Sequence, residues 1–384
     1  MDDDSPALPS TVGITIGPHK DCHYLASGLV SEVYRSKSHA LKVITETRDV
    51  EPHNPAREVK ILNELSHASV IKLNRTFRDG DGRLVLDFPF MPLTLAEIIS
   101  AGPVSEDLTK KCFHDLFSAL SYLHEKGIIH RDIKPSNLLL GSPTGPAYLS
   151  DFGTAWHPLL SPVDEPAEHK VLEVGTTCYR APETLFGNRA YDTSLDLWEA
   201  GTMLVECLRN PPQPLFESRD TSEDGNQLGL ILSIFKTLGT PTKAAWPEAA
   251  HFTTPPFEWY QSFPGKRWDE LLPGVDTDAI DLVSRLVYYE SGLRLTAAQV
   301  CVFEVFNACA NINLGTKPPI FQIDNWSYYR QLKYNFSITS TPLRICSKWS
   351  SEHFRLFLLV LRIRLQIPAT ISRSISQEKL ICKN

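Results

Sequence analysis

Polar side chains in the middle of the chain have the types and spacing that phosphoryl transfer needs. Asp132 and Asn137 lie five residues apart, with Lys134 between them. A second carboxylate, Asp151, follows the apolar run 147–149, which predicts a short strand. Phosphoryl transfer requires a carboxylate that accepts the proton of the attacking hydroxyl, oxygen ligands for Mg²⁺, and cations near the developing charge. This stretch contains all of these groups.

The same residues form the patterns H-R-D-x-K-x-x-N and D-F-G, through which the chain resembles the eukaryotic protein kinases. The resemblance implies an α+β, two-lobed fold with a small N-lobe of β-sheet plus one helix and a larger, mainly helical C-lobe. It also implies ATP as the phosphoryl donor. Asp132 would accept the hydroxyl proton, Lys134 would steady the γ-phosphoryl group, and Asn137 and Asp151 would hold Mg²⁺. Lysine at position 134 resembles the Ser/Thr rather than the Tyr kinases.

The stretch that begins at Leu25 lies where the family has its glycine-rich loop over the ATP phosphates. Of the pattern G-x-G-x-x-G-x-V only Gly28 and Val33 are kept, and Ala26 and Ser31 replace the other glycines. By the resemblance, Leu25, Gly28 and Val33 contact the nucleotide. Because Ala26 and Ser31 carry Cβ atoms, we expect weaker ATP binding than the full motif would give.

The apolar run 40–44 contains one lysine, Lys42, and predicts a strand that resembles V-A-I-K. A lysine in a buried strand is costly unless it is paired. We therefore expect Lys42 to contact the ATP phosphates and a helix carboxylate, and Ala40 to lie against the nucleotide. The helical spacing of apolar residues over 56–65 makes Glu58 that carboxylate.

Pro52, Arg57 and Glu58 resemble the P-S-T-A-I-R-E helix of the cyclin-dependent kinases. The middle of that motif, which meets the cyclin in the family, is not kept, and this argues against cyclin dependence. Further features of the same group are Y-R-A-P-E at 179–183, the run 234–241 and a Pro- and Trp-rich insert at 246–273.

The hinge between the lobes is expected at 87–91, after strands predicted at 70–73 and 84–86. In the family, adenine is bound there by backbone groups that include one N–H donor. Proline has no backbone N–H, so Pro89 cannot be that donor. We favour Met91 as donor, the Pro89 carbonyl as acceptor and Phe88 as the gatekeeper. The alternative makes Leu86 the gatekeeper and puts Pro89 at the donor position.

In the first part of the predicted C-lobe, an amphipathic helix is predicted at 108–125. It leads into the H-R-D-x-K-x-x-N stretch at 130–137, the catalytic loop of the family. The run D-L-W, which begins at Asp196, resembles part of the buried helix that anchors this loop in the family. Arg294 resembles the arginine that pairs with the A-P-E glutamate, here Glu183.

The activation segment runs from Asp151 to the Y-R-A-P-E motif at 179–183. At the position where the cyclin-dependent kinases have a phosphorylated threonine, this chain has Val171. The inhibitory Thr-Tyr pair of the glycine-rich loop is likewise replaced, by Leu29 and Val30. Together with the run 175–178, these changes resemble the monomeric, cyclin-independent kinases of fungi that activate cyclin-dependent kinases. That resemblance implies a monomer whose substrates are the activation segments of cell-cycle or transcription kinases. A preference for proline after the target residue stays open.

Arg131 needs an anionic partner, because an unpaired, partly buried guanidinium is costly. We expect a permanent carboxylate from the acidic run 164–169 or from Glu173 to replace the missing phosphate. The alternative is that these acids form a solvated loop and that Ser161, Thr176 or Thr177 is phosphorylated instead.

The net charge of −7 and the absence of a basic cluster argue against nucleic-acid binding. The apolar run 356–361 is too short to cross a membrane. Eight cysteines without a C-x-x-C pair and an acidic start indicate a reducing compartment, cytoplasmic or nuclear.

Along the chain we expect a disordered lead-in at 1–20, the N-lobe at 21–91, the C-lobe at 92–305 and a C-terminal extension of uncertain order at 306–384. The alternative function is a pseudokinase or scaffold that binds partners with little turnover, which only the degraded glycine-rich loop supports. Asp132, Lys42 and Asp151, whose loss marks pseudokinases, are all present.

Overall fold

The computed structural model describes residues 13–46, 51–161, 165–217, 223–257 and 261–302. These residues belong to one compact unit of the chain, 1–312, and a second unit comprises 313–384. The predicted C-terminal extension, the apolar run 356–361 and most of the lead-in therefore lie outside the described residues.

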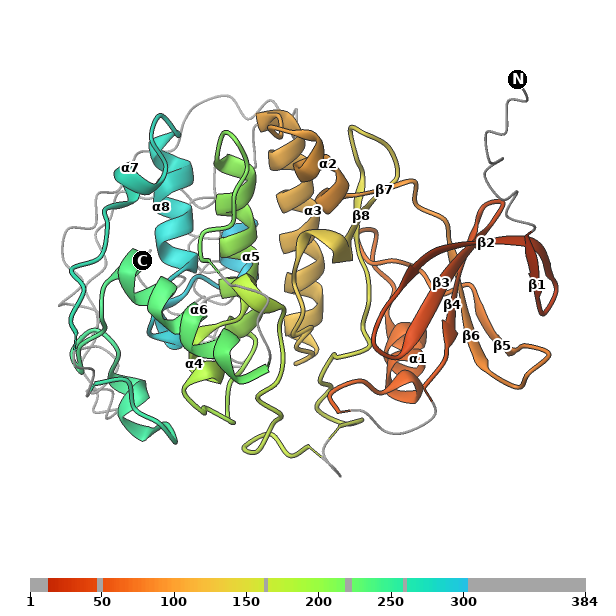
Figure 1. Cartoon of the computed structure of the whole chain (residues 1–384), viewed down its shortest axis with the longest axis horizontal. Helices are drawn as coiled ribbons and strands as arrows, with labels where there is room; N and C mark the ends of the chain where they lie inside the picture. Colours follow the sequence, from red (N-terminus) through yellow and green to blue (C-terminus); the bar gives the residue numbers. More distant parts are fainter. Residues whose placement is uncertain (1–12, 47–50, 162–164, 218–222, 258–260, 303–384) are drawn as a thin grey trace, which may run out of the picture. The chain divides into compact units, whose positions relative to one another are not determined.

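The N-lobe is built on an antiparallel, six-stranded sheet in the order β1-β2-β3-β4-β6-β5, drawn in red to orange in Figure 1. Side chains alternate between its faces. Leu41 and Val43 of β4 fill a small cluster on one face, whereas Lys42 between them points to the other. The strands are β1 (Ile14–Ile16), β2 (His19–Ser27), β3 (Ser31–Ser36), β4 (His39–Ile44), β5 (Arg75–Arg78) and β6 (Leu84–Pro89).

The sheet begins earlier than predicted, because β1 and the start of β2 lie within the expected lead-in. Ile16 is buried with Cys22 in the small cluster, and Gly17 has a φ of +52°, which allows the tight turn into β2. Burial of this single isoleucine orders a segment that its composition did not distinguish from a tail. The predicted lead-in at 1–20 is therefore too long.

Helix α1 (Pro55–Glu64) forms where predicted, with Asn54 as its N-cap accepting from the Arg57 N–H at 2.9 Å. The strand predicted at 70–73 is wrong. Within this run Val70 makes only an isolated bridge to Leu149, while the strand is β5, further along. The apolar side chains of the run are buried because they pack into the main core, not because they pair in a sheet.

The C-lobe is mainly helical and carries a small sheet in the order β7-β8-β9. Its longest helix, α3, buries one face as predicted, and α5 is buried almost throughout. The helices are α2 (Leu95–Ala101), α3 (Glu106–Glu125), α4 (Pro182–Leu185), α5 (Ser194–Leu208), α6 (Glu223–Leu238), α7 (Trp268–Leu271), α8 (Thr277–Leu286) and α9 (Ala297–Val300). The strands are β7 (Leu93–Thr94), β8 (Leu138–Leu140) and β9 (Ala147–Leu149).

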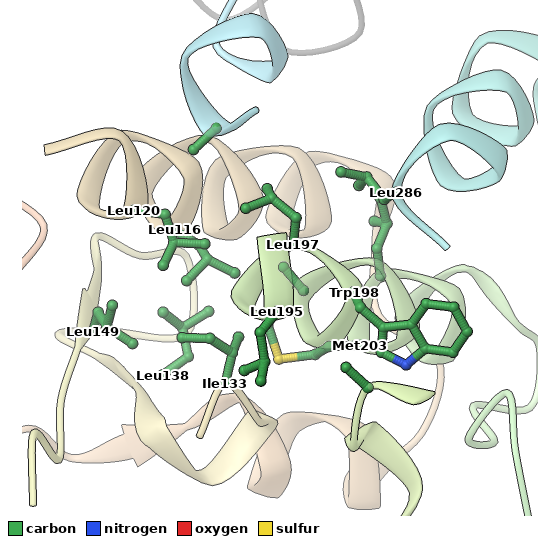
Figure 2. Packing of buried hydrophobic residues seen from close by; sticks show 14 of the residues in the cluster. Leu116, Leu120, Ile133, Leu138, Leu149, Leu195, Leu197, Trp198, Met203 and Leu286 are labelled. Carbon is green, nitrogen blue, oxygen red and sulfur yellow. The ribbon is translucent and has the colours of Figure 1, made fainter. Parts of the chain in front are cut away.

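The main core extends from the helices to the catalytic loop. Figure 2 shows Ile133 of that loop in one cluster with Leu116 of α3 and Leu195 of α5. Ile133 follows Asp132 directly, so packing of the core fixes the backbone at the site itself.

A buried ion pair joins the end of the activation segment to the C-lobe. Arg294 binds Glu183 through two parallel hydrogen bonds of 2.7 and 2.8 Å, and its guanidinium lies 5.0 Å from the ring centre of Trp198. The predicted pairing is confirmed. Glu183 lies in the first turn of α4, so the pair holds this short helix in place.

Replacing Arg294 by methionine is expected to lower the free energy of unfolding by about 3–5 kcal/mol, because Glu183 would stay buried without its partner. Urea denaturation measures the change. The double variant Arg294→Met/Glu183→Leu should regain part of the loss, since it removes the unpaired charge. A double variant no more stable than Arg294→Met would contradict this account.

Candidate active site

Asp196 at the start of α5 holds the catalytic loop. Its carboxylate accepts hydrogen bonds from the backbone N–H groups of His130 and Arg131 at 3.0 and 2.9 Å, and it lies 2.8 Å from His124 Nε2. Arg131 has a φ of +70°, a strained value that such contacts can maintain. The predicted anchoring role of this helix is confirmed.

Asp132 lies beside Lys134 and a residue that the sequence did not single out for this role, Thr176. Lys134 Nζ is 2.8 Å from Asp132 Oδ2, and the Thr176 hydroxyl donates to Asp132 Oδ1 at 2.6 Å. Lys134 Nζ also donates to Thr176 Oγ1 at 2.9 Å. The sequence suggested Thr176 only as a candidate phosphorylation site. The sequence feature that could have indicated a position near the catalytic base was the closeness of Thr176 to the Y-R-A-P-E motif. An aliphatic hydroxyl therefore already occupies the hydrogen-bonding site of the expected base.

Glu199 of α5 is a second residue that the sequence analysis missed. Its Oε2 accepts the Ile133 N–H at 2.7 Å, and burial raises the pKa of this carboxyl well above its usual value. A Cβ placed on Gly175, where φ is +77°, would lie 2.5 Å from Glu199 Oε1. Glu199 thus links the catalytic loop to a glycine of the activation segment that no larger residue could replace without a shift.

Asn137 and Asp151 provide oxygen atoms of the kind that Mg²⁺ prefers. The Asn137 amide nitrogen donates to Asp132 at 2.9 Å (backbone O) and 3.1 Å (Oδ2), so its amide oxygen is the atom it can offer to a cation. The Asp151 side chain is exposed, its φ is +62°, and it uses only Oδ1 for its 2.8 Å contact with Lys42. The ammonium of Lys42 holds the pKa of Asp151 well below its usual range, which keeps the carboxylate charged. The donor set therefore fits a divalent cation.

Lys42 joins three elements that are distant in the sequence. Its Nζ lies 2.8 and 2.9 Å from the two oxygens of Glu58 on α1 and 2.8 Å from Asp151 after β9. Burial alone would lower the pKa of Lys42, but attraction to Asp151 and Glu58 outweighs burial and raises it. The predicted contact between Lys42 and Glu58 is confirmed, and α1 is held towards the site.

The glycine-rich stretch forms the hairpin between β2 and β3. Val33 of β3 pairs with Ala26 of β2 on one side and with Lys42 of β4 on the other. Val33 therefore shares the sheet face of Lys42. A Cβ on Gly28 would meet only Ser31, at 3.8 Å. The protein's own packing does not require this glycine, which leaves its open side for a ligand.

Restoring the two missing glycines, Ala26→Gly with Ser31→Gly, is expected to lower the KM for ATP several-fold, because the backbone could then approach the phosphates more closely. Steady-state kinetics with varied ATP checks this. Ala26 is exposed whereas Ser31 is buried in β3, so Ala26→Gly alone should give most of the effect. An unchanged or higher KM would show that the present hairpin already suits its ligand.

The strand before the hinge places both gatekeeper candidates, Phe88 and Leu86, on the sheet face of Lys42. Ala40 pairs with Phe88, while Leu86 pairs with Lys42 and is fully buried. The Phe90 N–H donates to Ser38 O at 2.8 Å, and neighbouring residues of an extended strand direct their backbone groups to opposite sides. The carbonyl of Pro89, the last residue of β6, therefore points away from β4. This favours the alignment in which Met91 is the N–H donor to adenine and Pro89 offers its carbonyl.

On the opposite face of the sheet a polar cluster holds the end of β6. Asp87 is buried and lies 2.7 Å from His39 Nδ1, 3.0 Å from Arg75 Nε and 3.3 Å from His19 Nε2. These ion pairs and hydrogen bonds keep the strand in register directly before the hinge.

The molecule has a sheet-based lobe and a helical lobe. Lys42 contacts Glu58 and Asp151, and the loop with Asp132 and Asn137 is bonded to the residue before Asp151. Together these features define a protein kinase. Residues 25–306 match the protein kinase domain model, and the chain belongs to this family. It is 36% identical over 285 residues to "Serine/threonine-protein kinase csk1" of Schizosaccharomyces pombe, covering 71% of this chain and 89% of that protein. It is 33% identical over 272 residues to "Cyclin-dependent kinase 20" of Danio rerio, covering 70% of this chain and 75% of that protein.

These matches confirm the predicted fold and the predicted class, a serine/threonine kinase of the cyclin-dependent-kinase-like type. ATP is the phosphoryl donor of this family and proteins are its substrates. Among the described residues, no helix is both long enough and apolar enough to cross a membrane.

Proposed function

We propose that Asp132 is the catalytic base for transfer of the γ-phosphoryl group of MgATP to a serine or threonine hydroxyl. One observation carries the proposal: Lys42 lies within hydrogen-bonding distance of both Glu58 and Asp151, beside the loop that holds Asp132 and Asn137. Lys42 would bind the ATP phosphates, and Asn137 with Asp151 would hold Mg²⁺. The nucleotide would contact Leu25, Gly28, Val33, Ala40, Phe88, Pro89 and Met91.

In the proposed reaction the substrate hydroxyl takes the position that the Thr176 hydroxyl now occupies at Asp132 Oδ1. The hydroxyl oxygen forms a bond to the γ-phosphorus, the bond to the leaving ADP oxygen breaks, and Asp132 accepts the proton. Lys134 donates to the Thr176 hydroxyl oxygen, whose position the substrate hydroxyl would take. From there its ammonium offsets the negative charge on the transferred phosphoryl group. A bound Mg²⁺ would neutralise phosphate charge.

We further propose that the substrates are the activation segments of other cyclin-dependent-kinase-like enzymes. The resemblance to the fungal monomeric activating kinases supports this, and so does the identity to the Schizosaccharomyces pombe kinase over most of that protein's length. On this proposal the enzyme acts as a monomer without a cyclin, in the cytoplasm or the nucleus.

The substrate proposal is tested by incubating the purified chain with an inactive cyclin-dependent kinase and mapping phosphate by mass spectrometry. We expect modification of the activation-segment threonine, none with a threonine-to-valine substrate, and none with the Asp132→Asn enzyme. A peptide array run in parallel provides the comparison. Efficient phosphorylation of array peptides without modification of the segment would contradict the proposed substrate and leave the kinase assignment intact.

A further inference from the structure

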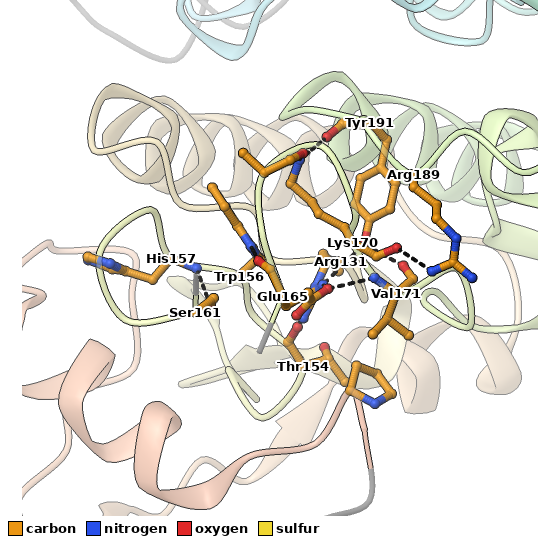
Figure 3. A network of polar contacts seen from close by, with 12 residues as sticks. Arg131, Thr154, Trp156, His157, Ser161, Glu165, Lys170, Val171, Arg189 and Tyr191 are labelled. Carbon is orange, nitrogen blue, oxygen red and sulfur yellow. Dashed lines mark hydrogen bonds and ion pairs between the residues drawn. The ribbon is translucent and has the colours of Figure 1, made fainter. Parts of the chain in front are cut away.

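Three buried cations surround one carboxylate in the activation segment. Arg131 of the catalytic loop, Arg57 of α1 and Lys170 are all nearly inaccessible to solvent, and so is Glu165. Figure 3 shows Glu165 beside Arg131, with Lys170, Val171 and Tyr191 around them. Buried charges of one sign require a compensating charge, so the partners of Glu165 matter for this whole region.

Glu165 binds three separate elements. Its Oε1 forms an ion pair with Arg131 Nη1 and accepts the Val171 N–H at 2.8 Å. Its Oε2 lies 3.7 Å from Arg57 Nη1. Among the described residues, Glu165 is the carboxylate that contacts both guanidinium groups. It therefore connects α1, the catalytic loop and the activation segment at one point.

The other bonds of these cations show why an anion is needed. Arg131 donates to Thr154 O at 2.6 Å and to the Tyr191 hydroxyl at 3.1 Å, and Arg57 donates to Pro52 O at 2.6 Å. All of these acceptors are neutral. Burial lowers the pKa of Arg57 and repulsion from Arg131 lowers it further, whereas Glu165 raises it.

Val171 stands where cyclin-dependent kinases carry the activating phosphothreonine, and its own N–H binds Glu165. We propose that Glu165 is a built-in replacement for that phosphate, so that the activation segment is ordered and the kinase active without modification. A carboxylate carries one negative charge against about 1.5 to 2 for a phosphate, so the order it gives is weaker but permanent.

The other candidates for this role are placed differently. Glu168 and Glu173 are exposed, and Asp164 lies outside the described residues. Of the alternative phosphorylation sites, Ser161 is buried and accepts the His157 N–H at 3.0 Å, while Thr176 binds Asp132. Phosphorylation of either hydroxyl would break these contacts.

The test uses protein from a bacterial host, assayed before and after phosphatase treatment, and mass spectrometry verifies that the treated protein carries no phosphate. We expect it to phosphorylate a protein substrate at the same rate before and after phosphatase treatment. A parent enzyme that is inert until another kinase modifies its segment would overturn the proposal.

Glu165→Gln keeps the shape of the side chain and removes its charge, so it should lower kcat by about tenfold or more. Glu168→Gln, the same change at an exposed position of the same segment, should stay within about twofold of the parent. Hydrogen exchange of 170–180 and of α1 should accelerate in Glu165→Gln and not in Glu168→Gln.

Glu165→Asp separates loss of charge from loss of folding, since it keeps a carboxylate on a shorter side chain. With melting temperatures measured for each variant, aspartate should retain more activity per folded molecule than glutamine. Equal activity of the Gln and Asp variants per folded molecule, or Glu165→Gln within about twofold of the parent, would overturn the proposal.

Discussion

Asp132→Asn is expected to reduce phosphoryl transfer by about 10²- to 10⁴-fold, the usual contribution of a positioned general base. Asparagine keeps one oxygen acceptor at this position, so it can still accept from Lys134 or from Thr176, but it cannot take up the proton of the substrate hydroxyl. The fold and the nucleotide site should persist, because the backbone of the catalytic loop is held by Asp196 and not by the Asp132 side chain.

Peptide phosphorylation under saturating MgATP measures the effect, and a fluorescent nucleotide checks that binding is retained. Asp107→Asn, the same change at an exposed position in the first turn of α3, serves as the matched control. If Asp132→Asn keeps activity within about twofold of the parent, another group accepts the proton.

Lys42→Arg is expected to lower kcat/KM for ATP by about 100-fold or more, because small misplacements of positioning groups have effects of that size. Arginine keeps the positive charge, so a fall in kcat/KM would show that the position of the cation matters as well as its charge. The single Nζ atom of Lys42 lies within 2.9 Å of three carboxylate oxygens from Glu58 and Asp151. A planar guanidinium fork is longer and cannot make the same contacts.

Lys72→Arg is the matched control, since Lys72 is an exposed lysine of the same lobe. Both variants should fold, which thermal melting checks. Wild-type kinetics in Lys42→Arg would show that the phosphates are held by other groups, and the proposed nucleotide site would then be wrong.

The local elements of the fold follow closely from the sequence. Helices α1 and α3 begin within about two residues of the positions predicted from apolar spacing, as expected for element boundaries. The strand containing Lys42 and the short strand before Asp151 are also confirmed. Periodicity succeeds here because each element buries one face against a continuous core.

The errors in the fold arise where burial is not periodic. The run 70–73 is apolar and buried, yet it lies in a loop against β9. The segment 14–16 is only three residues long and has one polar residue, Thr15, yet Ile16 is buried in a small cluster on one face of the sheet. In both segments part of the partner surface comes from distant residues, such as Leu149 for Val70 and Leu41 and Val85 for Ile16, so the local pattern alone does not distinguish them.

The sequence by itself predicted phosphoryl transfer, because Asp132, Lys134 and Asn137 lie in one short loop and their spacing is the signal. Only the tertiary structure decided which neighbours complete it. Several carboxylates could have paired with Arg131, and burial selected Glu165. Thr176 reaches Asp132 from 44 residues away in the sequence. Such contacts depend on how distant segments pack, and the energy of a charge or hydroxyl depends on its burial and partners, neither of which residue type alone specifies.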